Sequence, residues 1–168
     1  MQPLLSRDIL EQFDKALRSG GSREIGGLLF GEHVGDEMFR VVEITVQLKD
    51  GTFGDFVRDP AEHHLRLQKF FERTGENHTR FNYLGEWHSH PSFLPVPSLK
   101  DAATMSSMLD DPEVGVNFLV LLILRRRIMW GLEMSATSFR AGYEPASVQV
   151  FTELKTVPSS PRRRVRTI

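Results

Sequence analysis

Residues 81–101 read FNYLGEWHSHPSFLPVPSLKD, and this stretch decides how the rest of the chain is interpreted. It begins with an apolar, aromatic run that predicts a buried strand ending at His90. Pro91 follows, and proline ends a strand because it cannot donate to the sheet ladder. A loop rich in Pro and Ser comes next. Ser98 then predicts the start of a helix that runs to Asp110.

The two histidines of this stretch lie two residues apart on the predicted strand. Side chains at positions i and i+2 of a strand point to the same face, with α-carbons roughly 6.6 Å apart, so both imidazoles can reach one ion. If Ser98 begins a helix, Asp101 lies on the same helix face and can add a carboxylate oxygen. Two nitrogens and one oxygen leave a fourth tetrahedral position for water, which distinguishes catalytic from structural zinc sites. The spacing therefore predicts Zn²⁺ bound by His88, His90 and Asp101.

Hydrolysis at such an ion also requires a general base, and a carboxylate is the natural candidate. Glu24 precedes the apolar, glycine-rich run Ile25–Gly31, which would place it at the edge of the core. Glu86 is the alternative, because it lies two residues before His88 on the ligand strand. We favour Glu24, since a base must face the ligands across the water. Glu86 is then a partner of an imidazole N–H, or a charge near the edge of the site.

The run from His88 to Asp101 resembles the metal motif of the JAMM (JAB1/MPN/Mov34, or MPN+) metalloproteases, which is His-x-His-Pro, six residues, then Ser-x-x-Asp. The segment Glu24–Gly31 resembles the first strand of the same family, where a glutamate precedes a Gly-Leu-Leu-Gly-like stretch. The resemblance covers residues 20–135. It implies zinc on the two histidines and Asp101, Glu24 as general acid/base, and Ser98 as a hydrogen-bond donor to the oxyanion of the tetrahedral intermediate.

The strand Gly85–His90 is most similar to that of compact bacterial members of this family. Some of these accompany E1- and E2-like enzymes in antiphage operons of the cyclic-oligonucleotide (CBASS) type, where they remove a covalently attached nucleotidyltransferase. The resemblance implies a deubiquitinase-like zinc isopeptidase or peptidase. Its substrate would be the extended C-terminal tail of a ubiquitin-like protein, or of a CD-NTase/cGAS-like enzyme conjugated in the same way. The alternatives are a non-catalytic MPN-type scaffold and a processing peptidase of a ubiquitin-like sulfur-carrier protein.

The rest of the chain predicts a single α/β (α+β) domain of JAB/MPN type, with a mixed, mostly antiparallel sheet flanked by helices. We expect helices to begin at Ser6, at Asp59-Pro60 and at Ser98, and to end at Gly20-Gly21, Gly75 and Asp110. The expected strands are Ile25–Gly31, Phe39–Leu48, Phe81–His90, Val116–Leu124, Ile128–Met134, Ser138–Tyr143 and Val148–Leu154. We expect an exposed turn or edge at Arg125–Arg127, and solvent-facing side chains at His33, His63, His64 and His78.

Composition places this domain at residues 1–154 and a basic, solvated tail at 155–168. Five of the 21 basic residues lie in the tail, so residues 1–154 carry 16 basic against 22 acidic residues. The chain has no cysteine, hence no disulfide or thiolate site. The longest apolar run is too short to cross a membrane, and the N-terminus lacks the features of a secretory signal, so we expect a cytoplasmic protein. Nucleic-acid binding is not expected, because the formal net charge is −1.

Overall fold

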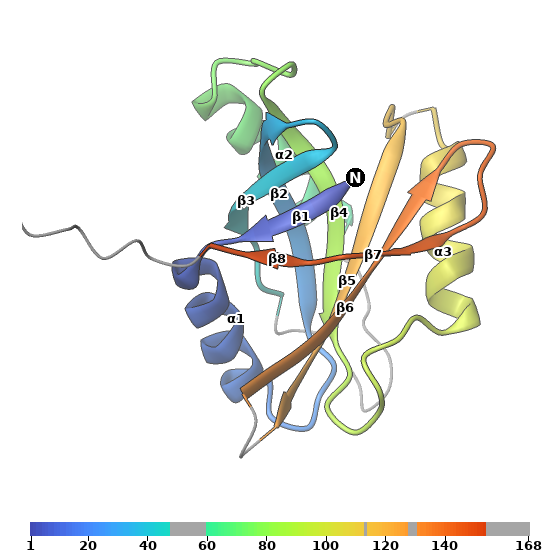
Figure 1. Ribbon diagram of the computed structural model, residues 1–168. Helices are drawn as coiled ribbons and strands as arrows, with labels where there is room; N and C mark the ends of the chain where they lie inside the picture. The colour runs from blue at the N-terminus through green and yellow to red at the C-terminus, as the bar shows by residue number, and fades with distance from the viewer. Residues whose placement is uncertain (48–59, 113, 128–130, 154–168) are drawn as a thin grey trace, which may run out of the picture.

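The computed structural model describes residues 1–47, 60–112, 114–127 and 131–153, and Figure 1 shows a curled sheet with helices packed against it. This arrangement confirms the predicted α/β domain. The elements are β1 Gln2–Leu5, α1 Arg7–Gly20, β2 Gly26–Gly35, β3 Met38–Ile44, α2 Pro60–Arg73, β4 Phe81–Ser89, α3 Leu99–Asp110, β5 Phe118–Arg127, β6 Gly131–Arg140, β7 Ala146–Val148 and β8 Phe151–Thr152. No helix in these ranges is long and apolar enough to span a membrane.

The strands form one mixed sheet in the order β7-β6-β5-β4-β2-β3-β1-β8. The pairs β1–β3, β1–β8 and β4–β5 are parallel, and the remaining four are antiparallel. The two outermost strands, β7 and β8, follow each other in the chain, and Figure 1 shows this segment crossing in front of the other strands. The end of the described chain therefore joins both edges of the curled sheet.

Helix α1 forms where its capping residues predict. The Ser6 side chain accepts a hydrogen bond from the backbone N–H of Ile9 at 3.3 Å, which satisfies a free donor at the helix N-terminus. At the other end Gly21 has a φ of 62°, a left-handed conformation that favours glycine. The buried face of α1 packs on one side of the sheet, where the ring of Phe13 meets Trp87 edge-on at 5.0 Å between centroids.

Two apolar clusters lie on the two faces of the sheet. The first gathers side chains from α1, β1 and the inner strands around Phe13 and Trp87. The second includes Phe70 of α2 and Met105 of α3, packed on residues of β2, β4 and β5. Each strand of the centre therefore separates two cores, which explains why the sequence of β5 is apolar without alternation.

The glycines of the central strands permit close contacts between backbones. A side chain at Gly27 would place its Cβ 2.1 Å from the carbonyl oxygen of Thr45, and one at Gly85 would lie 2.2 Å from that of Val120. Gly85 also has a φ of 129°, which other residues rarely adopt. These two positions let β2 and β4 meet their neighbours near the end of the sheet that carries the histidines.

Several predicted elements are wrong in detail. Within the described residues, one continuous strand, β6, replaces the two expected strands Ile128–Met134 and Ser138–Tyr143, because all ten residues of Gly131–Arg140 pair with β5. The expected turn or edge at Arg125–Arg127 is the paired end of β5. Carboxylates compensate these charges, since Arg125 binds Glu133 and Arg126 Nε lies 2.9 Å from Asp14.

The two ends of the chain also differ from expectation. Strand β1 is an element that the sequence did not predict, and Leu5 is its fully buried last residue. Its partners are β3 and β8, which lie far from it in the chain and give no local signal. The expected strand Val148–Leu154 is divided between β7 and β8, which pair with different strands. The tail 155–168, along with Leu48, Asp59, Ile128 and Leu154, lies outside the described residues.

Candidate metal centre

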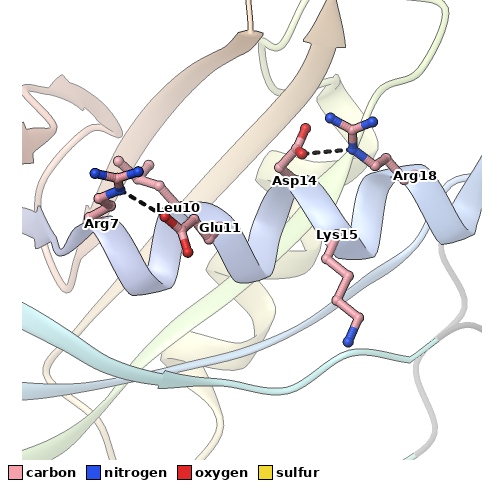
Figure 2. Close-up of a pocket in the computed structure, with 6 residues that line it drawn as sticks. All are labelled: Arg7, Leu10, Glu11, Asp14, Lys15 and Arg18. Carbon is pink, nitrogen blue, oxygen red and sulfur yellow. Dashed lines mark hydrogen bonds and ion pairs between the residues drawn. The ribbon is translucent and has the colours of Figure 1, made fainter.

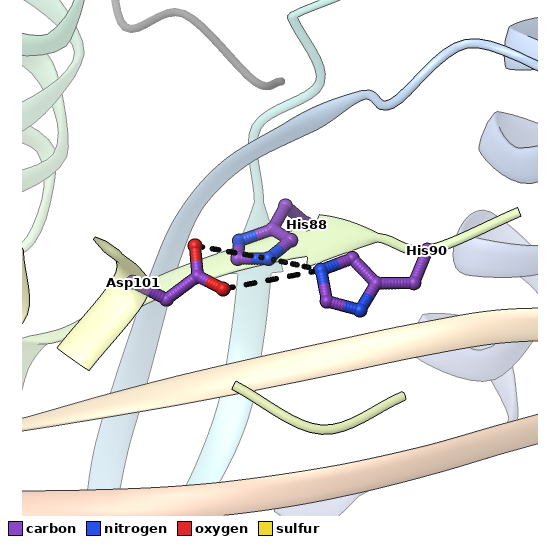
Figure 3. Close-up of side chains that lie close together, drawn as sticks. All are labelled: His88, His90 and Asp101. Carbon is purple, nitrogen blue, oxygen red and sulfur yellow. Dashed lines mark hydrogen bonds and ion pairs between the residues drawn. The ribbon is translucent and has the colours of Figure 1, made fainter. Parts of the chain in front are cut away.

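His88, in strand β4, and His90, directly after it, lie on one face at the end of the sheet. The Nε2 atoms of His88 and His90 lie 3.1 Å apart, and both side chains are largely buried. Asp101, in the first turn of α3, places Oδ1 at 3.6 Å from His88 Nε2 and Oδ2 at 4.0 Å from His90 Nε2. Figure 3 shows the carboxylate and the two rings directed toward a common point. The structure thus brings together the three predicted ligands.

The loop after β4 orients the second imidazole. His90 Nδ1 lies 2.9 Å from the carbonyl oxygen of Leu94, to which it donates when Nδ1 carries the proton. That tautomer leaves Nε2 with a lone pair facing His88 and Asp101. The same carbonyl accepts a hydrogen bond from Val96 N at 2.8 Å, so the loop turns tightly at Pro95. A backbone group therefore sets the direction of a ligand side chain.

A capping box at the start of α3 orients the carboxylate. Asp101 N donates to Ser98 Oγ at 3.1 Å, and Asp101 Oδ2 accepts from both Ser98 N and Ser98 Oγ at 2.7 Å. Burial raises the pKa of Asp101, but the nearby His88 imidazole and the hydrogen bonds from Ser98 outweigh it, so this pKa lies below its usual range. Asp101 is therefore ionised at neutral pH, with Oδ1 directed at His88.

The donor set fits zinc in type and in spacing. Ligands at 2.0–2.1 Å from a tetrahedral ion are about 3.3 Å apart, and the measured separations of 3.1, 3.6 and 4.0 Å lie close to this value. Within the described ranges, this is the group of histidine and carboxylate side chains close enough to hold an ion. His88, His90 and Asp101 are the residues that would bind it, with one position left for another molecule.

Glu24 lies beside the ligand strand, just before β2. Ser89 N donates to the carbonyl of Ile25 at 2.8 Å, and Ile25 N donates to Ser89 Oγ at 3.1 Å. Because Gly26 pairs with His88, continuing this antiparallel register places Glu24 opposite His90, on the same face of the sheet. Glu24 is 6% exposed, which agrees with the expected position at the edge of the core.

Glu86 is not a charge near the edge of the site, which was one of its two expected roles. Its side chain is fully buried, between two strands and against helix α2. His63 of α2 places its Nδ1 4.0 Å from Glu86 Oε1. His63 was expected to face solvent, but its side chain is only 14% exposed because α2 packs over this part of β4. His33, His64 and His78 are exposed as expected.

A surface hollow elsewhere on the molecule has no comparable donor set. It lies on the outer side of α1 and is lined by Arg7, Leu10, Glu11, Asp14, Lys15 and Arg18. Figure 2 shows two ion pairs along the helix, Arg7 with Glu11 and Arg18 with Asp14. Pairs of this kind at spacing i, i+4 stabilise an exposed helix, and the hollow is lined by no histidine that could join its carboxylates as a zinc ligand.

Sequence reasoning missed three groups around the site. The carbonyl of Leu94 is a backbone atom, and no residue type predicts it. Ser135 of β6 donates to the carbonyl of Pro95, a contact between segments 40 residues apart. The burial of His63 could be predicted from the helical spacing of α2 only if α2 were already known to cover β4. All three depend on tertiary contacts.

Comparisons with known proteins identify relatives of this chain. The CD-NTase/cGAS isopeptidase of Vibrio cholerae serotype O1 is 29% identical over 113 residues, which is 64% of this chain and 65% of that protein. The CD-NTase/cGAS isopeptidase of Enterobacter hormaechei is 29% identical over 123 residues, 72% of this chain and 66% of that protein. The chain thus spans less than two thirds of the length of these relatives.

A solution structure of a protein from Desulfitobacterium hafniense shares the fold, with a TM-score of 0.65 and 21% identity over 90% of this chain and 92% of that one. The family model of prokaryotic homologues of the JAB domain matches residues 6–141, which is most of the chain. This range includes both histidines, Asp101 and Glu24. The chain belongs to the prokaryotic JAB-domain family.

Proposed function

We propose that this chain is a zinc-dependent isopeptidase or peptidase. It hydrolyses the bond after the C-terminus of a ubiquitin-like protein, or of a protein conjugated in the same manner. The observation that carries the proposal is the convergence of His88, His90 and Asp101 within 4.8 Å of one another. Membership of the JAB family and the names of the relatives support it.

Those names suggest the substrate. The relatives are called CD-NTase/cGAS isopeptidases, so the candidate is a CD-NTase joined through its C-terminal carboxyl to an amine of another protein. Such a substrate would place this enzyme in the cytoplasm, in bacterial antiphage defence. An extended C-terminal tail can bind by strand addition. Within the described residues β7 pairs only with Ala136, Thr137 and Ser138 of β6, so Gly131–Ser135 offers an edge beside the loop that follows β4.

Each site residue has a role in the proposed reaction. Zinc, when bound, would supply a Lewis acid and a water nucleophile that is active near neutral pH. Glu24 takes the proton of the attacking water and delivers it to the leaving amine. The Ser98 hydroxyl donates to the oxyanion, for which its O–H turns away from Asp101 Oδ2. That oxygen keeps its hydrogen bond from Ser98 N.

Turnover of a defined conjugate tests the proposal. The substrate is a CD-NTase joined through its C-terminal carboxyl to the side-chain amine of a lysine peptide. A ubiquitin conjugate of the same peptide is assayed as a second substrate. The zinc-loaded wild type should release the free peptide. Glu24→Gln should lower the rate about 100- to 10,000-fold, the range for loss of a general base, and bind zinc as the wild type does.

Two results would contradict the proposal. If the zinc-loaded wild type leaves both conjugates intact, the chain is not an isopeptidase of this class, and the scaffold alternative gains support. If Glu24→Gln cleaves at a rate near that of the wild type, Glu24 is not the base. Glu86→Gln is then the variant to measure.

A further inference from the structure

Large apolar side chains are exposed beside the candidate metal centre. In the described chain nine large apolar side chains are exposed, and four of them lie in the segment that joins His90 to Asp101. Their exposed fractions are 57% for Phe93, 62% for Leu94, 53% for Val96 and 92% for Leu99. These four form what we call the apolar rim. Exposed apolar side chains gathered in this way mark an interaction surface.

Hydrogen bonds hold the apolar rim in place. Its Leu94 carbonyl accepts from His90 Nδ1 and from Val96 N, at 2.9 and 2.8 Å. Pro95, between two rim residues, is buried, and its carbonyl accepts from Ser135 of β6. Leu99 follows directly on the capping box that fixes Asp101. The rim is therefore organised before binding, and burying it costs less ordering entropy than burying a free loop.

We propose that the apolar rim docks the protein substrate, through an apolar surface that flanks the scissile amide. This inference rests on the proposed function. We identify the molecule that binds the rim as the substrate because the rim is continuous with the metal centre. The carbonyl that orients His90 belongs to the rim residue Leu94. A protein that brings an amide to His88, His90 and Asp101 approaches the segment between two of these ligands, and this segment carries the rim. A second copy of this chain bound there would instead cover the centre.

The test measures binding and turnover of the same conjugate. Phe93→Ser and Leu99→Ser remove the two rim side chains that contribute no hydrogen bond to the centre in this structure, and the double variant combines them. Tyr143→Ser is the matched control, because Tyr143 is 76% exposed on the turn between β6 and β7. The conjugate is the CD-NTase–peptide described above. The short reference substrate is a dipeptide acylating the side-chain amine of lysine.

We expect the double variant to lower kcat/KM for the conjugate about 10- to 100-fold, mainly through KM, which is the effect of losing two apolar contacts. Zinc content, and kcat/KM for the short substrate, should change by less than about twofold, because surface substitutions away from a site have small effects. Tyr143→Ser should match the wild type on both substrates. Affinity for the uncleaved conjugate, measured in the Glu24→Gln background, should fall in parallel with kcat/KM.

Three outcomes would overturn the inference. Unchanged conjugate cleavage in the double variant would show that the substrate does not use the rim. Equal losses on both substrates would give the rim a structural role only. Concentration-dependent dimers that disappear in the double variant would identify a second copy as the occupant. If the wild type binds the conjugate through the rim but does not cleave it, the proposed function is wrong and the docking role of the rim is retained.

Discussion

Trp87 and His88 are neighbours on strand β4, but they point to opposite faces of the sheet and meet different surroundings. The ring of Trp87 is fully buried against Phe13 of α1, and its Nε1 donates to the carbonyl of Thr45 at 2.8 Å. His88 faces two other potential ligands, His90 and Asp101, with no apolar side chain between their donor atoms. One face of β4 has the packing of a protein core, and the other holds polar atoms directed at one point.

This difference separates stability from chemistry. Apolar burial contributes free energy in proportion to the area removed from water, so the α1 face stabilises the domain whether or not an ion is present. Polar donors that face one another without an ion contribute little, and they are retained where binding or catalysis requires them. Substitutions on the two faces should therefore change different measured quantities.

The largest effect is expected on the α1 face. Trp87→Ala leaves a cavity beside Phe13 and removes the hydrogen bond to Thr45, and it should lower the free energy of unfolding of the metal-free protein by about 3–5 kcal/mol. Urea denaturation followed by circular dichroism measures this. Trp87→Phe, which keeps most of the buried area, should lose less. An alanine variant as stable as the wild type would contradict the assignment of this face to the core.

The next effect is expected on the opposite face. Asp101→Ala removes a ligand, and the zinc affinity should fall more than the roughly 10- to 100-fold that follows loss of a group that only orients a ligand. Competition with a zinc chelator measures the affinity. Ser98→Ala is the matched control, because it breaks the same capping box and keeps the carboxylate. Equal affinities in Asp101→Ala and the wild type would remove Asp101 from the ligand set.

A smaller effect should reach the site from strand β6. Ser135 donates to the carbonyl of Pro95, next to the Leu94 carbonyl that orients His90. Ser135→Ala should lower zinc affinity about 10-fold, and Ser135→Thr should restore it, since threonine keeps the hydroxyl. Ser138 lies on the same strand, and its hydroxyl oxygen has no hydrogen-bond partner among the described residues, so Ser138→Ala should bind zinc normally. If both alanine variants behave alike, Ser135 has no positioning role.

The smallest effect is expected at the N-terminus of α1, and it tests whether stability and zinc binding depend on different faces of the sheet. Ser6→Ala removes the N-cap hydrogen bond to Ile9 and should lower the free energy of unfolding by about 1 kcal/mol. Zinc affinity should stay that of the wild type, because α1 packs on the other side of the sheet. Thermal denaturation and the chelator competition together measure this. A change in zinc affinity would mean that the two faces are coupled.

The sequence predicted the parts of this structure that are encoded locally. Ser6, Gly21 and Ser98 mark helix ends through their own side-chain or backbone preferences. The spacing of His88 and His90 predicts a shared strand face, and the structure places them on one. These features depend on residues within one turn or one strand.

The parts that it could not predict depend on contacts between distant segments. Strand β1 exists because β3 and β8 lie on either side of it. The continuity of β6 follows from its pairing with β5, since its own mixture of small and polar residues suggested two short strands. His63 was expected in solvent, and it is mostly buried because α2 packs over β4. Tertiary packing overrides local pattern in each case.

The most direct test of the central claim is zinc titration of the metal-free chain, with X-ray absorption at the zinc edge on the loaded protein. The account predicts one tightly bound zinc per chain. Its spectrum should show two imidazole nitrogens and oxygen ligands at about 2.0–2.1 Å. His88→Ala should take up no zinc at the same concentration. A wild-type chain that binds no zinc, or whose bound zinc lacks imidazole ligands, would contradict the account.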